Sequence, residues 1–145
     1  LVGACDLAVA SEDARFATSG INVGLFCSTP SVSVSRNIPR KQAMELLLTG
    51  EFIDAKTALK WGLINRITSR DKLDAEVQKL ADPILSKSSV AVFTGKKMFY
   101  NQLEKNMEDA YTFAGEIMAC NMMAEDVNEG IDAFVKKRTA VWKGR

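Results

Sequence analysis

Apolar and polar positions alternate near the start of the chain and then recur every three or four residues. The alternation predicts short strands over 6–10 and 15–18, separated by a turn at 12–14. A third strand-like stretch covers 63–67. A few strands followed by a mostly helical remainder are typical of an α/β or α+β fold.

Three short helices are expected between the second and third strands. The first covers 31–38, and Pro39 suits the first turn of the next, which Gly50 ends. The apolar face of that second helix is expected to contain Ala43, Met44, Leu47 and Leu48. Asp54 can cap the third helix by accepting backbone N–H bonds, and Gly62 ends it. Its buried side is expected to contain Ala55, Ala58 and Leu59.

The second half of the chain is predicted to be helical. An amphipathic helix is expected from Ser69 on, followed by helices over 89–103 and 106–124. A last helix is expected to open at 126–129, where the spacing resembles a capping box. A group of methionines is more typical of a core or an oligomer interface than of a cofactor site. These are Met107, Met118, Met122 and Met123.

Composition and charge exclude several classes of protein. The net charge of +1 favours neither nucleic acid nor an anionic membrane as a partner. No apolar run approaches the ~20 residues of a membrane span, and the start does not resemble an export signal. Three widely spaced cysteines indicate neither a disulfide framework nor a zinc site, and without histidine the chain has no Ser-His-Asp triad. We therefore expect an intracellular protein with no metal and no cofactor.

One stretch of the chain carries almost no charge. The nineteen positions between Phe16 and Arg36 contain no Asp, Glu, Lys, Arg or His, and Cys27 is their only titratable side chain. With no basic neighbour in the sequence, Cys27 is expected to be a buried, inert thiol. The Gly- and Ser-rich run either turns the chain at the edge of the core or lines an uncharged pocket. The residues alone leave both interpretations open.

An ordered set of short motifs resembles the enoyl-CoA hydratase/isomerase, or crotonase, superfamily. The motifs are CDLAVAS at 5–11, ARFA at 14–17, N-x-G at 22–24, LLTG at 47–50, A-x-x-A-x-x-x-G-L-I at 55–64 and EG-x-x-AF-x-x-KR at 129–138. Together they span nearly the whole chain. The uncharged run is most similar to one mitochondrial branch of the superfamily and its bacterial relatives.

The resemblance implies an α/β fold, namely the second half of a crotonase-like ββα superhelix. Residues 1–68 would be the C-terminal part of that core, and 69–145 a helical region that builds homotrimers or hexamers. The implied ligand is an acyl-CoA thioester of fatty-acid metabolism, in the bacterial cytoplasm or the eukaryotic mitochondrion. The oxyanion-hole donors and the first catalytic glutamate of the family would precede Leu1, so we expect a segment of a longer protein.

The resemblance also raises a question about catalysis. Hydratases of this superfamily use two glutamates that hold a water and move its proton. The second belongs to a P-E-x-x-x-G pattern, and in the matching stretch 19–24 its position is taken by Gly20. Because glycine has no proton to move, we expect no two-glutamate hydration and name no catalytic residue. The nearby acids Glu12 and Asp13 are expected in a solvent-facing turn.

With the resemblance, the uncharged run is predicted to line the ligand pocket. The predicted substrate-binding residues are Ser19, Gly20, Val23, Gly24, Leu25, Phe26, Phe134 and Lys137. In the family, the motif around Phe134 and Lys137 lies beside the coenzyme A nucleotide. The alternative is that 136–138 form an exposed basic helix end that interacts with its own dipole.

Two functions stay open at this point. The first is an enzyme of the hydratase/isomerase family that acts on an acyl-CoA thioester as a lyase or isomerase. The second is a non-catalytic CoA-binding or assembly subunit whose helices associate with further copies.

Overall fold

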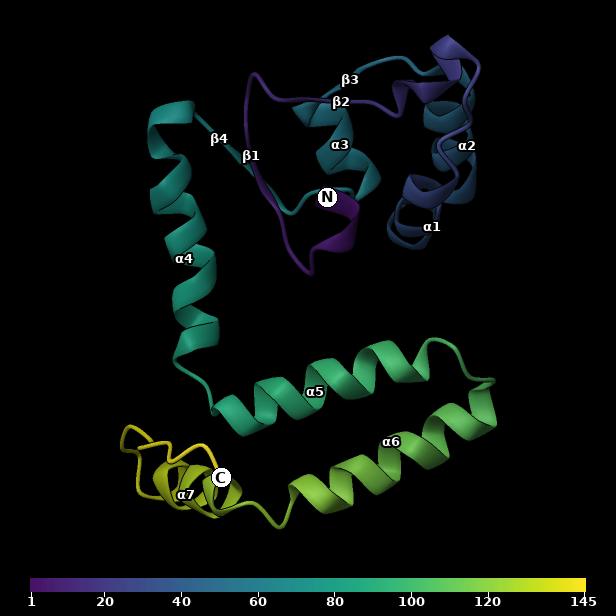
Figure 1. Ribbon diagram of the computed structural model, residues 1–145. Helices are drawn as coiled ribbons and strands as arrows, with labels where there is room; N and C mark the ends of the chain where they lie inside the picture. Colours follow the sequence, from purple (N-terminus) through teal and green to yellow (C-terminus); the bar gives the residue numbers. More distant parts are fainter. The chain divides into compact units, whose positions relative to one another are not determined.

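The computed structural model describes residues 1–145 and divides into two compact units, Leu1–Lys79 and Leu80–Arg145 (Figure 1). The first unit contains all four short strands, whereas the second is helical. The predicted α/β fold class is confirmed, and the predicted boundary at residue 68 stays a prediction. None of the helices combines the length and the hydropathy that crossing a bilayer requires.

The strands of the first unit form two separate pairs. Their bounds are β1 (Val9–Ser11), β2 (Arg15–Phe16), β3 (Ile53–Asp54) and β4 (Arg66–Thr68). β1 pairs in parallel with β4, and β2 pairs antiparallel with β3. Asn65 extends the β1–β4 ladder, because its side chain accepts the Ala8 N–H at 2.8 Å and its own N–H donates to the Ala8 carbonyl at 2.8 Å. All three predicted strands are present, but each is shorter than expected.

Three α-helices and three short 3₁₀ helices complete the first unit before the long helix α4. Their bounds are η1 (Val2–Ala4), η2 (Ser19–Val23), α1 (Ser28–Asn37), α2 (Arg40–Thr49), α3 (Ala55–Trp61) and η3 (Arg70–Lys72). α1 begins before the predicted 31–38, because Pro30 is tolerated in a first helical turn, where no intrahelical N–H bond is lost. As predicted, Gly50 and Gly62 end α2 and α3 in the left-handed region, with φ of 63° and 86°. Asp54 caps α3 by accepting the Thr57 N–H at 2.7 Å.

The core of the first unit corrects the predicted helix faces. α2 buries Ala43, Leu46 and Leu47, whereas Met44 and Leu48 are 44% and 55% exposed. The prediction was right for Ala43 and Leu47 and wrong for Met44 and Leu48. It omitted Leu46, which is buried and whose carbonyl accepts the Thr18 hydroxyl hydrogen at 2.7 Å. In α3, Ala55 and Ala58 are fully buried as predicted, but Leu59 is 40% exposed.

The second unit is built from helices in the predicted order. After α4 (Leu73–Leu85), which spans the boundary between the units, come α5 (Ser89–Gln102), α6 (Met107–Asn121) and α7 (Glu125–Val135). α5 and α6 pack against each other as a hairpin (Figure 1). The core interpretation of the methionines is wrong for this chain, because all four side chains are exposed. The exposed fractions are 74% for Met107, 68% for Met118, 50% for Met122 and 83% for Met123. The interface interpretation stays a prediction.

The predicted capping box at the start of α7 is wrong. Ala124 precedes the helix, and Asp126 lies inside it, 3% exposed. Its carboxylate accepts bonds from the Ser88 hydroxyl at 2.6 Å and from the backbone N–H groups of Lys143 and Gly144 at 2.7 and 3.1 Å. These bonds hold the pKa of Asp126 below its usual range. Asp126 therefore links the C-terminal tail to the start of α5 by hydrogen bonds.

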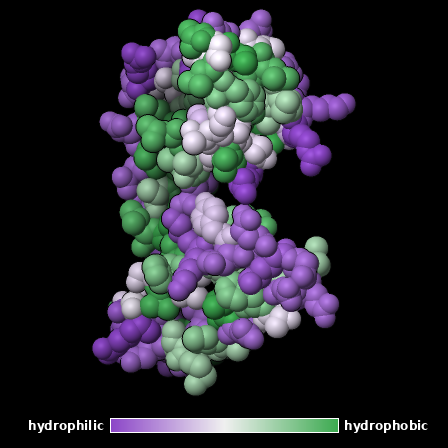
Figure 2. Space-filling view, turned by 45° about the vertical axis from the view of Figure 1, so that its right-hand side comes forward, coloured by the Kyte–Doolittle hydropathy of each residue, from purple (hydrophilic) through white to green (hydrophobic).

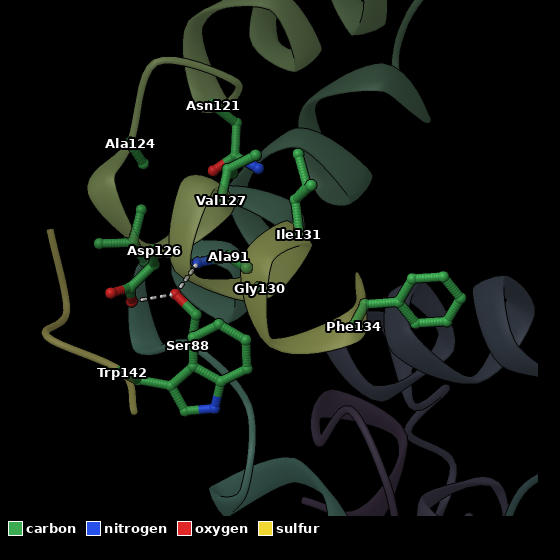
Figure 3. A pocket seen from close by; sticks show the side chains of 11 residues that line it. Ser88, Ala91, Asn121, Ala124, Asp126, Val127, Gly130, Ile131, Phe134 and Trp142 are labelled. Carbon is green, nitrogen blue, oxygen red and sulfur yellow. Dashed lines mark hydrogen bonds between the residues drawn. The ribbon is translucent and has the colours of Figure 1, made fainter. Parts of the chain in front are cut away.

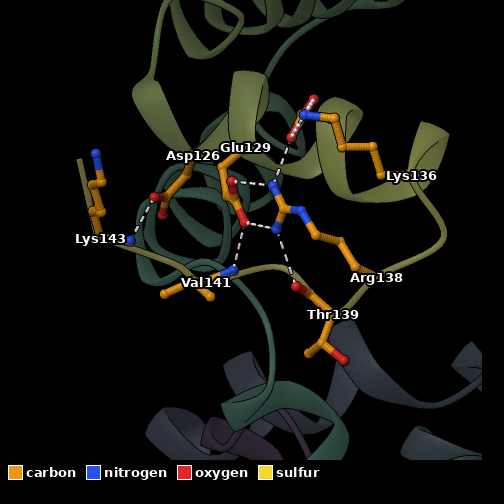
Figure 4. A network of polar contacts seen from close by, with 8 residues as sticks. Asp126, Glu129, Lys136, Arg138, Thr139, Val141 and Lys143 are labelled. Carbon is orange, nitrogen blue, oxygen red and sulfur yellow. Dashed lines mark hydrogen bonds and ion pairs between the residues drawn. The ribbon is translucent and has the colours of Figure 1, made fainter.

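Glu129, a second carboxylate of α7, also forms hydrogen bonds with the segment that follows the helix (Figure 4). Glu129 accepts two bonds from the Arg138 guanidinium, at 2.6 and 2.8 Å, and a third from the Val141 N–H at 2.7 Å. Arg138 also pairs with Asp132 at 2.7 Å. The bonds from Arg138 and Val141 lower the pKa of Glu129 from 4.5 to about 2.

The lowered pKa of Glu129 predicts acid sensitivity. The Glu129 carboxylate takes up its proton near pH 4.5 in the unfolded chain and near pH 2 in the folded one. The stabilisation that its bonds to Arg138 and Val141 give the fold is therefore complete above pH 4.5 and is lost as the pH falls toward 2. Urea unfolding at about pH 6 and about pH 3 should show that Glu129→Gln costs more stability at the higher pH. The exposed Glu116→Gln is the control and should change little at either pH. An equal cost of Glu129→Gln at both pH values would contradict the assignment.

Candidate functional site in the first unit

The first unit contains a cavity of about 680 Å³. Its wall is formed by η1, β2, the start of η2 and one side of α1, with Leu46 and Leu63 from the core beneath. The polar groups along it are chiefly hydroxyls. They come from Thr18, Ser19, Thr29 and Ser33.

The predicted pocket residues of the uncharged run divide into two groups. Ser19 and Gly20 line the cavity. Val23, Leu25 and Phe26 are 83%, 68% and 38% exposed and are not among its lining residues, and neither is Gly24. The turn explains the division, because Gly24 adopts a φ of 81° and the Leu25 N–H donates back to the Gly20 carbonyl at 3.0 Å. The tip of the run therefore points away from the cavity that its beginning lines.

Gly20 is packed too closely for any side chain. A Cβ atom there would lie 2.6 Å from the Leu25 carbonyl oxygen and 2.8 Å from the Cys27 Sγ atom. The Leu25 carbonyl belongs to backbone held by the bond to Gly20, so it cannot move aside cheaply. The space that a glutamate would need is filled by the chain itself.

No carboxylate lines the cavity. Arg15 is the only charged side chain in its wall, and its guanidinium lies 5.0 Å from the centroid of the Phe52 ring. Glu12 and Asp13 are exposed in the turn after β1, as predicted, and Asp13 pairs with Arg70 at 2.8 Å. Cys27 is half-buried rather than buried and lines the cavity. The cavity can hold an uncharged group by contact and by hydroxyl hydrogen bonds, but it offers no general base of the carboxylate type.

Arg15 and most of the hydroxyls were missed by sequence reasoning. Ser33 lies on α1 and donates to the Pro30 carbonyl at 3.1 Å, and Thr18 is buried against α2. The alternation of serine at 31, 33 and 35 was the available signal. It does not mark one face of a helix, and only the fold shows that Ser33 reaches the cavity.

The two predicted residues near the C-terminus lie in the second unit. Phe134, at the end of α7, is 85% exposed. Lys137 has a φ of 53°, and the N–H groups of Lys137 and Arg138 donate to the carbonyls of Phe134 and Ala133. This pattern ends a helix and usually has glycine at the left-handed position. The conformation is uncommon for a residue other than glycine.

Two of the three basic residues at 136–138 form ion pairs, and Lys137 does not. Lys136 pairs with Asp132 at 2.7 Å, and Arg138 is held by Glu129 and Asp132. All three residues are exposed, so the alternative interpretation as an exposed basic helix end stays open, and Lys137 is the one of the three without an ion pair.

The structure shows no cluster of three or more His, Cys, Asp or Glu side chains able to hold a metal ion.

Comparison with known proteins places these features in a family. The family profile described as enoyl-CoA hydratase/isomerase matches residues 1–145. Over 142 residues the chain is 47% identical to the mitochondrial enoyl-CoA hydratase domain-containing protein 3 of Mus musculus, covering 98% of this chain and 47% of that protein. It is 33% identical to a probable enoyl-CoA hydratase of Rhizobium meliloti (strain 1021), covering 97% of this chain and 55% of that protein.

Solved structures give the same result for the fold. A Mycobacterium smegmatis enoyl-CoA hydratase superposes with a TM-score of 0.95 at 52% identity, covering 97% of this chain and 55% of that one. Human enoyl coenzyme A hydratase domain-containing protein 3 superposes with a TM-score of 0.92 at 45% identity, covering 97% of this chain and 56% of that one.

The chain thus spans about half the length of the curated relatives it matches. The expected crotonase fold is confirmed, as is the similarity to the branch that contains enoyl-CoA hydratase domain-containing protein 3. The chain belongs to the enoyl-CoA hydratase/isomerase, or crotonase, superfamily.

Proposed function

We propose that the protein binds an acyl-CoA thioester and does not hydrate it by the two-glutamate route. The observation that carries this proposal is the cavity of about 680 Å³ whose wall includes Gly20 and contains no carboxylate. In hydratases of the family, the position matched by Gly20 holds the second glutamate. Here it is closed by the Leu25 carbonyl and the Cys27 thiol.

The walls of the cavity fit the neutral part of such a ligand. Side chains such as Phe16 and Val34 can contact an acyl chain, while the hydroxyls of Ser19 and Thr29 can bind its polar atoms. We propose that the oxyanion-hole donors belong to the part of the family fold that this chain does not include. Any chemistry of the whole protein would then be enolate chemistry with a base other than residue 20.

The second unit has a separate candidate contact for coenzyme A at the C-terminal end of α7. We propose that Phe134 contacts the coenzyme A nucleotide and that Lys137 binds a phosphate oxygen with its unpaired ammonium. The high exposure of Phe134 and the uncommon backbone conformation of Lys137 support these roles.

The variant Lys137→Gly separates binding from folding. It removes the ammonium, while glycine suits the φ of 53°, so stability should stay equal or rise. Isothermal titration of the protein with butanoyl-CoA should show the dissociation constant rising by about five- to tenfold, as for loss of one charge-assisted contact. The exposed loop residue Lys87→Gly is the matched control and should bind as the native protein does.

Unchanged butanoyl-CoA affinity in Lys137→Gly would contradict the role of Lys137. A native protein that binds no acyl-CoA at all would overturn the proposal and favour the assembly subunit of the second function.

That second function is an assembly subunit, and one observation favours it. The helices α5 and α6 expose Phe93, Tyr111 and Met118 at 70%, 75% and 68%, and Figure 2 shows hydrophobic residues at the molecular surface. Soluble chains rarely expose so many large apolar side chains unless a partner covers them. We propose that further copies of the chain cover them, in the trimer or hexamer that the family resemblance implies. This association is compatible with acyl-CoA binding.

A further inference from the structure

A second cavity lies wholly within the second unit. It has a volume of about 350 Å³ and is lined by residues of α5, α6, α7, their flanking segments and the C-terminal tail (Figure 3). Most of its wall is hydrophobic. The main apolar contributors are Val90, Ala91, Val127, Ile131, Phe134 and Trp142.

Two polar residues of the cavity wall already have their partners. Ser88 donates to Asp126 at 2.6 Å and accepts the Ala91 N–H at 3.3 Å. Asp126 also accepts the N–H groups of Lys143 and Gly144. These groups have little hydrogen-bonding capacity left for anything inside the cavity.

Asn121 differs from them. Its Oδ1 atom is buried without a hydrogen-bond partner, and it is the only such side-chain atom in the chain. The side chain points from the end of α6 toward α7 (Figure 3). Because buried acceptors in native proteins nearly always have a donor, this oxygen is suited to accept a hydrogen bond from a group that enters the cavity.

A water molecule fits this position poorly. A buried water usually makes two to four hydrogen bonds, whereas most of this wall is hydrophobic and Asn121 Oδ1 is its only buried side-chain polar atom without a partner. A ligand with one donor group and an apolar remainder matches both the oxygen and the walls.

Trp142 gives the cavity a fixed aromatic wall. Its Nε1–H donates to the Ser86 carbonyl at 2.7 Å, which holds the ring in place. Gly130 lets the ring come close, since a Cβ there would lie 3.3 Å from two of its carbons.

We propose that this cavity binds a small neutral alcohol, whose hydroxyl donates to Asn121 Oδ1 and whose hydrocarbon part contacts Val127, Ile131 and Trp142. The proposal does not depend on thioester binding, because Phe134 at the rim is the only residue that the two assignments share.

Fluorescence titration of the native assembly tests the site. The chain has two tryptophans, so the Trp61→Phe background leaves Trp142 as the reporter. Octanol should produce a saturable change in emission. Methyl heptyl ether, of similar length but without a donor, should bind about tenfold more weakly, as expected for one lost hydrogen bond.

Two variants and a control localise the effect. Asn121→Leu should lower the octanol affinity about tenfold, to that of the ether, and leave the ether affinity unchanged. Val127→Phe keeps the amide but fills the cavity, so it should abolish binding of both. Asn128→Leu is the same change at an exposed position of α7 and should have no effect. Thermal unfolding of each variant establishes that it is folded.

Three results would overturn the proposal. They are a lack of saturable change with octanol, equal binding of octanol and the ether, and unchanged octanol affinity in a folded Asn121→Leu variant. If the emission of Trp142 changed with protein concentration but not with octanol, the occupant of the cavity would instead be a second copy of the chain.

Discussion

Replacing Gly20 with glutamate is expected to destabilise the protein by about 1–3 kcal/mol, as overpacking of a filled site does. It is also expected not to create crotonyl-CoA hydration. The new Cβ atom would meet the Leu25 carbonyl at 2.6 Å and the Cys27 Sγ atom at 2.8 Å. Relief requires breaking the bond from the Leu25 N–H to the Gly20 carbonyl, which closes the turn. The carboxylate would therefore not reach the position at which it works in hydratases.

A matched variant separates this local clash from a general effect of adding glutamate. Gly115 lies in the middle of α6, where a Cβ atom would meet nothing within 4 Å. Gly115→Glu should be neutral or stabilising, because glutamate is a better helix former than glycine by several tenths of a kcal/mol. Urea unfolding gives both stabilities. Native-like stability together with new hydration activity in Gly20→Glu would refute the packing argument.

Truncating Leu46 to alanine should cost about 2–5 kcal/mol of the free energy of unfolding. Leu46 is the largest fully buried side chain of the chain and packs in the core of the first unit, beneath the cavity. The cavity left behind cannot collapse easily, because the Leu46 carbonyl is fixed by the Thr18 hydroxyl and by the Gly50 N–H. Chemical denaturation at constant protein concentration measures the loss.

Leu48, two residues further along the same helix, provides the control. It is 55% exposed, so Leu48→Ala should change the free energy of unfolding by no more than about 0.5 kcal/mol. If Leu48→Ala proved as costly as Leu46→Ala, the assignment of the buried face of α2 would be wrong.

Local signals predicted most of the fold. Gly50, Asp54 and Gly62 act through their own backbone or side chain within one helical turn, and the structure confirms all three. The ordered motifs predicted the superfamily, and the comparisons confirm it. Pattern alone did not show which apolar stripe of α2 faces inward, because Met44 and Leu48 repeat at the same spacing as Ala43 and Leu47.

Long-range contacts account for most of what the sequence did not predict. Asp126 resembled a local cap, but its partners Ser88 and Lys143 are 38 and 17 residues away. Arg15 was not predicted at the cavity, because only its strand position brings it there. Within the uncharged run, the fold of the turn at Gly24 decides that Ser19 lines the cavity and Val23 does not.

The central claim is that the cavity of the first unit lacks the carboxylate that hydration needs. Its most direct test is the steady-state hydration of crotonyl-CoA by the native protein, with butanoyl-CoA binding measured on the same sample. The account predicts that butanoyl-CoA binds and that hydration stays near the rate without enzyme. Rapid hydration that is lost when an acid of this chain, such as Glu12 or Asp13, is replaced by its amide would contradict it.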